Sequence, residues 1–531
     1  MAQSNNGSTS ATYALGGTVT GLTSPGLILS NNGVNRLIHA GATVFKFGTF
    51  PQGTSYDVTI TRQPQAQVCD VTNGTGTLSA TPANITVSCS EKPRWSWMTG
   101  SDAVYASGDY GTQGVASPGN TPGARYESVS WTDAYGKLWL FGGLANSAQG
   151  SGYVNDLWKF DPADNQWTWV KGSSTTSSPG VYGTLGVAAP NNVPGGRVGS
   201  NEWTDYNGDF WIFGGLGIDA TGNGYFLNDF WKYDPETNEW TAENNAQYNG
   251  VGTVSVCGVQ GVANSTDIPG PRFESVSWRD GHGNFWLFGG YGCDANNNLG
   301  DLNDMWKYNM RTNTWTRIGG SQLTGSTGSF GVRGVAATTN FPSARQRAAS
   351  WVDSYGNFWL FGGEGVDAHG ASYVLNDLWK FDIITKTWTW VSGSDSVLAT
   401  GVYGTRGVES PANVPGARSG AVSWFDKAGD FWMFGGWGTD STGVGVYVLS
   451  DLWKYNPSTN MWTWMSGPNV YLMKGIYGTQ GIAATDNIPG ARYEDAAWID
   501  NDRNLWLFGG SGIDSTGASG FLNDMWKYDL N

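Results

Sequence analysis

The chain has little histidine and little positive charge. Only three of its 531 residues are histidine, His39, His282 and His369, and they are far apart in the sequence. The sequence therefore offers too few histidines to indicate a histidine-based metal centre or a Ser-His-Asp triad. The 29 Lys and Arg residues are outnumbered by 44 Asp and Glu residues, which gives a net charge of -15. This charge repels phosphate backbones and anionic lipid headgroups, so nucleic acid is not an expected partner.

Long apolar runs and helical periodicity are also missing. No apolar stretch is long enough to cross a bilayer, so we expect no membrane insertion. No segment has the 3.6-residue period of a long amphipathic helix. The 79 glycines and the aromatic content of 14% are typical of tightly turned, aromatic-packed strands. The sequence therefore predicts an all-β protein.

Four cysteines form two local pairs, Cys69 with Cys89 and Cys257 with Cys293. Each pair lies within one expected domain or one repeat, which favours disulfides and an oxidising compartment. The alternative is four buried free thiols. With disulfides, we expect a secreted or cell-surface protein.

Residues 12–91 contain short alternating runs separated by turn residues. Examples are residues 16–20, 56–60 and 84–89. Several short strands at this spacing predict a small β-sandwich. The segment resembles the immunoglobulin-like modules that precede repeat domains in bacterial surface proteins. The polar residues 1–11 before it are predicted to be a disordered tail.

From about residue 92 onward the chain repeats a unit of about 73 residues. Its most regular block, W-L-F-G-G or a close variant, occurs six times, at residues 139–143, 211–215, 286–290, 359–363, 432–436 and 506–510. Each unit begins with an arginine-containing segment and reads as four strands, in the first copy residues 125–131, 138–141, 156–160 and 166–170. Four strands per unit are typical of a propeller blade.

The double glycine after an apolar strand, followed by spaced Trp and Tyr, resembles the kelch repeat. This resemblance covers about 440 residues and implies a six-bladed β-propeller over residues 92–531. The sixth copy lacks its last strand, and an additional copy of that strand stands at Trp95–Trp97. We expect this N-terminal strand to close the ring and remove an exposed sheet edge.

The 29 tryptophans suggest sugar stacking at first sight. Twenty-eight of them recur at equivalent positions of the repeat, so we expect them to fill the space between blades. Only Trp437 falls outside this register, which makes it a candidate ligand contact.

Long connections are expected on one face of the propeller, and recognition usually lies on such loops. Arginines that enter the innermost strand from this face are candidate ligand contacts, together with Tyr291 and Trp437; they are Arg125, Arg197, Arg272, Arg345, Arg418 and Arg492. In kelch propellers that bind acidic peptides, arginines at a comparable place bind carboxylates. The alternative pairs each arginine with one recurring aspartate, namely Asp156, Asp229, Asp304, Asp377, Asp451 or Asp524.

The third repeat carries oxygen ligands at alternating positions of one loop. Asp294, Asn296, Asn298 and Asp301 are therefore candidate calcium ligands, although no glutamate closes the loop. The alternative is a type I turn, as in the equivalent loops of other repeats. Apart from calcium, no cofactor is expected.

Three functions remain open. The first is a binding or adhesion protein that recognises a glycan or an extracellular protein through the long-loop face. The second is a carbohydrate-active enzyme, a hydrolase or a mutarotase, at the channel mouth; the kelch-type sialic-acid mutarotases are an analogy by fold. The third is a structural protein that self-associates into an extracellular layer or filament. A cluster of Arg, Glu and Tyr in one pocket would favour the enzyme, and a broad apolar loop surface would favour assembly.

Overall fold

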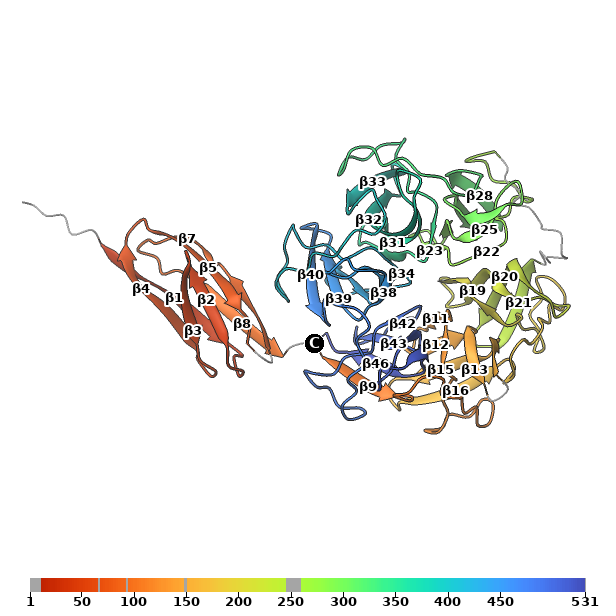
Figure 1. Ribbon diagram of the computed structural model, residues 1–531, viewed down its shortest axis with the longest axis horizontal. Coiled ribbons are helices and arrows are strands. Elements are labelled where there is room, and N and C mark those ends of the chain that lie inside the picture. Colours follow the sequence, from red (N-terminus) through yellow and green to blue (C-terminus); the bar gives the residue numbers. More distant parts are fainter. Residues whose placement is uncertain (1–10, 65–66, 92–93, 148–149, 245–258, 531) are drawn as a thin grey trace, which may run out of the picture. The chain divides into compact units, whose positions relative to one another are not determined.

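The structure is a computed structural model that describes residues 11–64, 67–91, 94–147, 150–244 and 259–530. In these ranges all regular secondary structure is β-strand, as the sequence predicts, and no helix that could span a membrane occurs in them. The chain divides into two compact units, the first ending at Arg94 and the second covering Trp95–Leu530 (Figure 1). The tail expected at residues 1–11 lies, except for Ala11, outside the described residues.

The first unit consists of two four-stranded sheets around one apolar core. One sheet has the order β4-β1-β8-β6 and the other β3-β2-β5-β7. Leu15 and Val87 of the first sheet pack in one cluster with Leu29 and Val58 of the second. The strands are β1 (Thr12–Thr20), β2 (Leu27–Asn31), β3 (Val34–Ile38), β4 (Val44–Pro51), β5 (Ser55–Arg62), β6 (Gln67–Thr72), β7 (Thr75–Thr77) and β8 (Ile85–Glu91).

A disulfide joins Cys69 and Cys89, which lie opposite each other on β6 and β8. This expected pair is confirmed. Cys293 is buried and forms no disulfide within the described part of the chain. Its expected partner Cys257 lies in residues 245–258, outside the described residues.

Among the described residues of the second unit, six sheets of four or five strands are built on one plan (Figure 1). The first strands are β11 (Val129–Thr132), β18 (Asn201–Thr204), β23 (Val276–Arg279), β30 (Ala349–Val352), β35 (Val422–Phe425) and β42 (Ala496–Ile499). The second strands are β12 (Leu138–Phe141), β19 (Phe210–Ile218), β24 (Phe285–Phe288), β31 (Phe358–Val366), β36 (Phe431–Phe434) and β43 (Leu505–Phe508). The third strands are β15 (Leu157–Asp161), β20 (Gly224–Asp234), β27 (Met305–Asn309), β32 (Ser372–Asp382), β39 (Leu452–Asn456) and β46 (Met525–Tyr528). The fourth strands are β16 (Gln166–Lys171), β21 (Glu239–Asn244), β28 (Thr314–Gly319), β33 (Thr387–Ser392), β40 (Met461–Ser466) and β9 (Trp95–Thr99).

Short strands precede each first strand, on the side of the long loops. They are β10 (Arg125–Tyr126), β17 (Arg197–Val198), β22 (Arg272–Phe273), β29 (Arg345–Gln346), β34 (Arg418–Ser419) and β41 (Arg492–Tyr493). Two of them pair with extensions of β19 and β31. The others belong to small sheets with β13 (Leu144–Ser147), β14 (Gly150–Tyr153), β25 (Tyr291–Cys293), β26 (Leu299–Asp301), β37 (Trp437–Gly438), β38 (Tyr447–Val448), β44 (Ser511–Ile513) and β45 (Ser519–Phe521).

The first strands surround a common centre, because each contacts the first strand of the next sheet and β42 contacts β11 again. Aromatic side chains fill the space between neighbouring sheets. Trp131 stacks on Phe210 of the next sheet with ring centroids 4.9 Å apart, and Trp278 stacks on Phe358 at 5.1 Å. These repeated tryptophans therefore belong to the packing of the sheets, as the sequence predicts.

The N-terminal strand of the second unit completes its last sheet. β9 pairs antiparallel with β46, with Trp95 opposite Tyr528 and Trp97 opposite Trp526. Trp95 is 1% exposed and packs 5.3 Å from the ring of Phe434 in the preceding sheet. The two ends of this unit thus share one sheet, which leaves neither end as a free edge.

Candidate functional site

The innermost strand is interrupted where the sequence predicts a continuous strand over residues 125–131. The structure ends β10 at Tyr126 and starts β11 at Val129, and Glu127 between them has a φ of 54°. The same interruption occurs in every sheet, at Glu127, Gly199, Glu274, Arg347, Gly420 and Glu494, with φ angles from 54° to 63°. This left-handed region costs about 1–3 kcal/mol for a residue other than glycine, and such strain is often found at functional sites.

These six residues, here called the axial ring, are joined by backbone hydrogen bonds. The N–H of Glu127 donates to the carbonyl oxygen of Glu494 at 3.1 Å, and that of Gly199 donates to Glu127 at 3.1 Å. The series continues through the remaining four residues at 2.8–3.0 Å and returns to Glu494. Each of the six sheets therefore contributes one residue to a closed hydrogen-bonded ring at the centre.

The side chains of the ring residues form an ionic cluster. The Arg347 guanidinium donates to the Glu127 carboxylate at 3.0 Å and lies 2.6 Å from the Glu494 carboxylate. It also forms an ion pair with Glu274, and the carboxylate of Glu364 lies 3.9 Å away. The three ring glutamates place oxygen atoms within 4.8 Å of one another. One cation is thus surrounded by carboxyl groups from several sheets.

The two glycines of the ring leave room for this cluster. A Cβ atom at Gly199 would lie 2.9 Å from Cγ of Glu274, and one at Gly420 would lie 3.1 Å from Cγ of Glu494. A larger residue at either position would push against a cluster carboxylate. The two glycines thus leave space for the carboxylates, and they also adopt the left-handed backbone conformation without strain.

Burial and mutual repulsion set the protonation of the cluster. Burial raises the pKa of Glu274 and of Glu494 well above the usual range; Glu127 adds to the rise and Arg347 opposes it. Both side chains are only 5–6% exposed, whereas Arg347 is 22% exposed. Carboxyl groups this close do not all ionise readily together, so the cluster favours a carboxylic acid next to a carboxylate.

Aromatic residues stand next to the cluster. Tyr126 and Tyr493 immediately precede ring residues, and burial together with Glu127 and Glu494 raises the pKa of the Tyr126 phenol. Tyr291 pairs with Phe273, and Trp437 pairs with Ser419, in each case the residue before a ring position. Both predicted contact residues are half-buried, and their rings pack against other aromatic residues, Tyr291 against Phe273 and Trp437 against Tyr373.

The six predicted arginines lie elsewhere, inside the sheets. Each is at most 1% exposed and is paired with the recurring aspartate, in the pairs Arg125–Asp156, Arg197–Asp229, Arg272–Asp304, Arg345–Asp377, Arg418–Asp451 and Arg492–Asp524. Arg197, for example, donates to both oxygens of Asp229, at 2.7 and 2.8 Å, and to two backbone carbonyls. The expectation that they bind ligand carboxylates is therefore corrected: these guanidinium groups are buried and already paired, as in the alternative.

The predicted calcium residues divide between two environments. Asp294 accepts hydrogen bonds at 2.8 Å from the backbone N–H groups of Asn296 and Asn298, which is the geometry of the turn alternative. Asp301 lies in β26, where burial and the nearby Glu364 raise its pKa to about 7. The Asp294 carboxylate is occupied by N–H donors, and Asp301 belongs to the surroundings of the axial ring.

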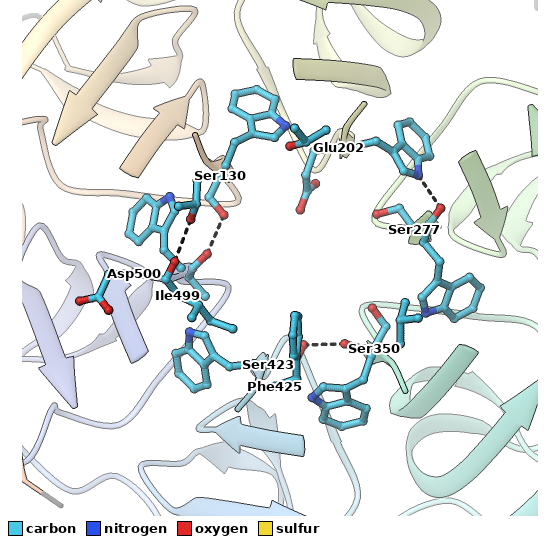
Figure 2. A pocket seen from close by; sticks show the side chains of 18 of the residues that line it. Ser130, Glu202, Ser277, Ser350, Ser423, Phe425, Ile499 and Asp500 are labelled. Atoms are coloured by element: carbon cyan, nitrogen blue, oxygen red, sulfur yellow. Dashed lines mark hydrogen bonds between the residues drawn. The ribbon is translucent and has the colours of Figure 1, made fainter. Parts of the chain in front are cut away.

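A cavity of 710 Å³ lies in the channel between the first strands, lined by residues such as Ser130, Glu202 and Ser350 (Figure 2). Its lining residues come three or more positions after the ring residue of each first strand, on the side of the short turns. The sequence pattern predicts a site on the long-loop face and indicates neither the ring nor this cavity. One sequence feature could have indicated the ring. Its position is occupied by Glu, Gly, Glu, Arg, Gly and Glu in six repeats that are otherwise similar.

The comparisons relate part of the second unit to known proteins. Residues 191–403 match the model of the KLHDC2/KLHL20/DRC7 Kelch-repeats domain, so this part of the chain is similar to kelch repeats. The chain is also similar to N-acetylneuraminate epimerases of Haemophilus influenzae strains PittEE and 86-028NP, with 28% identity over 130 residues in each case. The matches cover 22% of this chain and 33% of each relative, so the chain spans about a third of the length of the curated relatives it matches.

Proposed function

We propose that the axial ring is the active site of a carbohydrate-active enzyme that opens and closes the ring of a free reducing sugar, as a mutarotase does. The observation that carries this proposal is the contact of Arg347 with the ring glutamates of three other sheets. A structural ion pair needs one carboxylate, whereas acid–base catalysis needs carboxyl groups in both protonation states.

The architecture we propose for this enzyme is a closed six-bladed kelch propeller. Its support is the cycle of contacts among the six first strands and the closed hydrogen-bonded ring. The first unit is then an immunoglobulin-like spacer, and the Cys69–Cys89 disulfide favours a secreted or cell-surface location.

The proposed reaction requires two coordinated proton transfers. A protonated glutamic acid, Glu274 or Glu494, gives its proton to the ring oxygen of the sugar while the bond from that oxygen to the anomeric carbon breaks. A carboxylate removes the proton of the anomeric hydroxyl, and that oxygen becomes the carbonyl oxygen of the open chain. After rotation about the adjacent carbon–carbon bond, the reverse transfers close the other anomer. No oxidant, metal or water is consumed.

The roles of the individual residues follow from their contacts. Glu127 accepts a hydrogen bond from Arg347, which suits the carboxylate that acts as base. Glu274 and Glu494, with raised pKa values, suit the acid. Tyr291 and Trp437 are proposed to stack on the sugar.

Nuclear magnetic resonance exchange spectroscopy tests this function. Neutral, N-acetylated and anionic reducing sugars are equilibrated with the protein, and the rate of anomer exchange is compared with the rate without it. We expect accelerated exchange for at least one sugar. A glycoside released as free sugar would instead identify a hydrolase, and an unchanged exchange rate for the whole panel would exclude the proposal.

A second candidate, binding or assembly through the loops, is supported by one repeated feature. An exposed aliphatic residue occupies the same loop position in all six repeats; these are Val115, Val187, Val262, Val335, Val408 and Ile482, 39–57% exposed. Such regular apolar exposure is typical of contact surfaces. Sedimentation of the purified protein, compared with a variant in which three of these residues are serine, tests for self-association. A monomer in both cases would exclude assembly.

A further inference from the structure

The channel cavity has one position that breaks its pattern. The inward position of the first strand, three residues after the axial ring, is Ser130, Ser277, Ser350, Ser423 or Ala497 in five sheets and Glu202 in the sixth. Figure 2 shows the Glu202 side chain pointing into the open centre. The cavity therefore has a wall of small hydroxyl groups that carries a single carboxyl group.

Glu202 has no counterion. No Lys, Arg or His of the described chain forms an ion pair with it. The other lining carboxylate, Asp500, is directed away from the cavity (Figure 2) and accepts hydrogen bonds from Asn504 and Trp506. Burial raises the pKa of Glu202 to about 8. A half-buried carboxyl group that faces a cavity without a charged partner is costly to ionise unless a ligand satisfies it.

Two hydroxyl groups on the same wall are also available. Ser130 donates to the carbonyl of Ala497 at 3.0 Å, and Ser423 donates to that of Ser350 at 3.0 Å. The hydroxyls of Ser277 and Ser350 form no such bond among the described residues. Glu202, Ser277 and Ser350 thus offer three acceptor groups.

The mouth of the cavity is apolar on one side. Val352, Phe425 and Ile499 come from three successive sheets and line the cavity two residues beyond the serine level. Phe425 is 44% exposed. Arg279, at the equivalent position of β23, is directed to Tyr206, with its guanidinium carbon 4.7 Å from the ring centroid. Arg503 also lines this side, with its guanidinium carbon 5.8 Å from the centroid of the Phe425 ring. A ligand that enters here meets these apolar groups and Arg503 first, and the serines and Glu202 deeper.

We propose that this cavity binds a primary ammonium group on a short apolar stem. An ammonium group has three N–H donors, which match the hydroxyls of Ser277 and Ser350 and the carboxyl oxygens of Glu202, whose ionised form the bound cation stabilises. The stem lies against Val352, Phe425 and Ile499. A volume of 710 Å³ is in the usual range for small-molecule sites. This site is separate from the axial ring and does not depend on the proposed sugar chemistry.

Isothermal titration calorimetry with hexylammonium chloride tests the proposal, and hexan-1-ol and sodium hexanoate serve as comparison ligands. We expect hexylammonium to bind at least about tenfold more tightly than hexan-1-ol, and hexanoate not to bind. Equal affinity for the amine and the alcohol would overturn the proposal, as would the absence of amine binding.

The variant Glu202→Ser assigns the binding to this cavity. Serine occupies the same position in four other sheets, so the strand should tolerate it; Glu202→Gln is a second variant of similar shape. We expect each to weaken hexylammonium binding at least about tenfold without lowering the melting temperature. Glu236→Gln, in an exposed turn, is the matched control and should bind as the unchanged protein does. Unchanged affinity in both Glu202 variants would refute the site.

Discussion

The Arg347 guanidinium lies 3.0 Å from the Glu127 carboxylate, although 220 residues separate the two along the chain. They belong to the first and fourth sheets, and the backbone ring places them on opposite sides of the centre. Their contact therefore requires that all six sheets close around the centre. The same closure places Glu274 and Glu494 beside Arg347 and buries them.

The raised pKa values of Glu274 and Glu494 predict a pH dependence of stability. Their folded pKa values lie above that of an unfolded glutamate, about 4.3, because burial and Glu127 disfavour the charged forms. Their contribution is therefore complete below about pH 4.3 and is lost as the pH rises through the folded values. We expect the double variant Glu274→Gln, Glu494→Gln to gain melting temperature relative to the unchanged protein as the pH rises. A difference that is constant from pH 4 to 9 would contradict this.

Removal of one charge from a buried Arg–Asp pair should be strongly destabilising. Burial would raise the pKa of Asp229, but Arg197 outweighs this and leaves it below the usual range. Its contribution is thus present above the unfolded pKa and is lost as the pH falls through the folded value. We expect Asp229→Asn to lower the free energy of unfolding by about 3–5 kcal/mol, measured by urea denaturation at neutral pH.

The half-exposed pair Lys137–Asp161 provides the matched control, because its side chains are 30% and 26% exposed. There we expect Asp161→Asn to change the free energy of unfolding by at most about 1 kcal/mol. Equal effects of the two substitutions would argue against a structural role for the buried pairs.

The closing strand should contribute much of the stability of the second unit. Trp95 is buried against Phe434 and pairs with β46, so Trp95→Ala leaves a cavity between sheets. We expect a loss of about 3–5 kcal/mol in urea unfolding, and a larger loss when residues 92–98 are deleted. A melting temperature unchanged by the deletion would show that the ring does not need this strand.

The loop at Asp294 should not require calcium. Its carboxylate accepts hydrogen bonds from backbone N–H groups of the turn. A cation bound to this carboxylate would displace these donors and break the turn. We expect the same melting temperature in EDTA and in excess calcium. A clear increase with calcium would restore the predicted site of Asp294, Asn296, Asn298 and Asp301.

Local features of the fold are well predicted by the sequence. The strand 138–141, the Cys69–Cys89 pair and the closing role of Trp95 follow from periodicity, spacing and repeat number. The axial ring does not, because nothing in a strand pattern signals that Glu127 is left-handed, and the contact of Glu127 with Arg347 depends on closure of the whole ring. The sequence shows that Glu202 replaces the serine found at this position in four other repeats. Only the arrangement of the six first strands around one centre shows that its side chain faces a cavity.

The most direct test of the proposed sugar chemistry is the anomer exchange rate of the variant Glu127→Gln, measured on the sugar that the unchanged protein accelerates most. We expect a loss of about 100-fold or more in kcat, because the amide cannot accept the anomeric proton. The melting temperature should stay close to that of the unchanged protein, and Glu409→Gln, an exposed residue of a loop, should keep full activity. Full activity of Glu127→Gln would contradict the assignment of the axial ring as the active site.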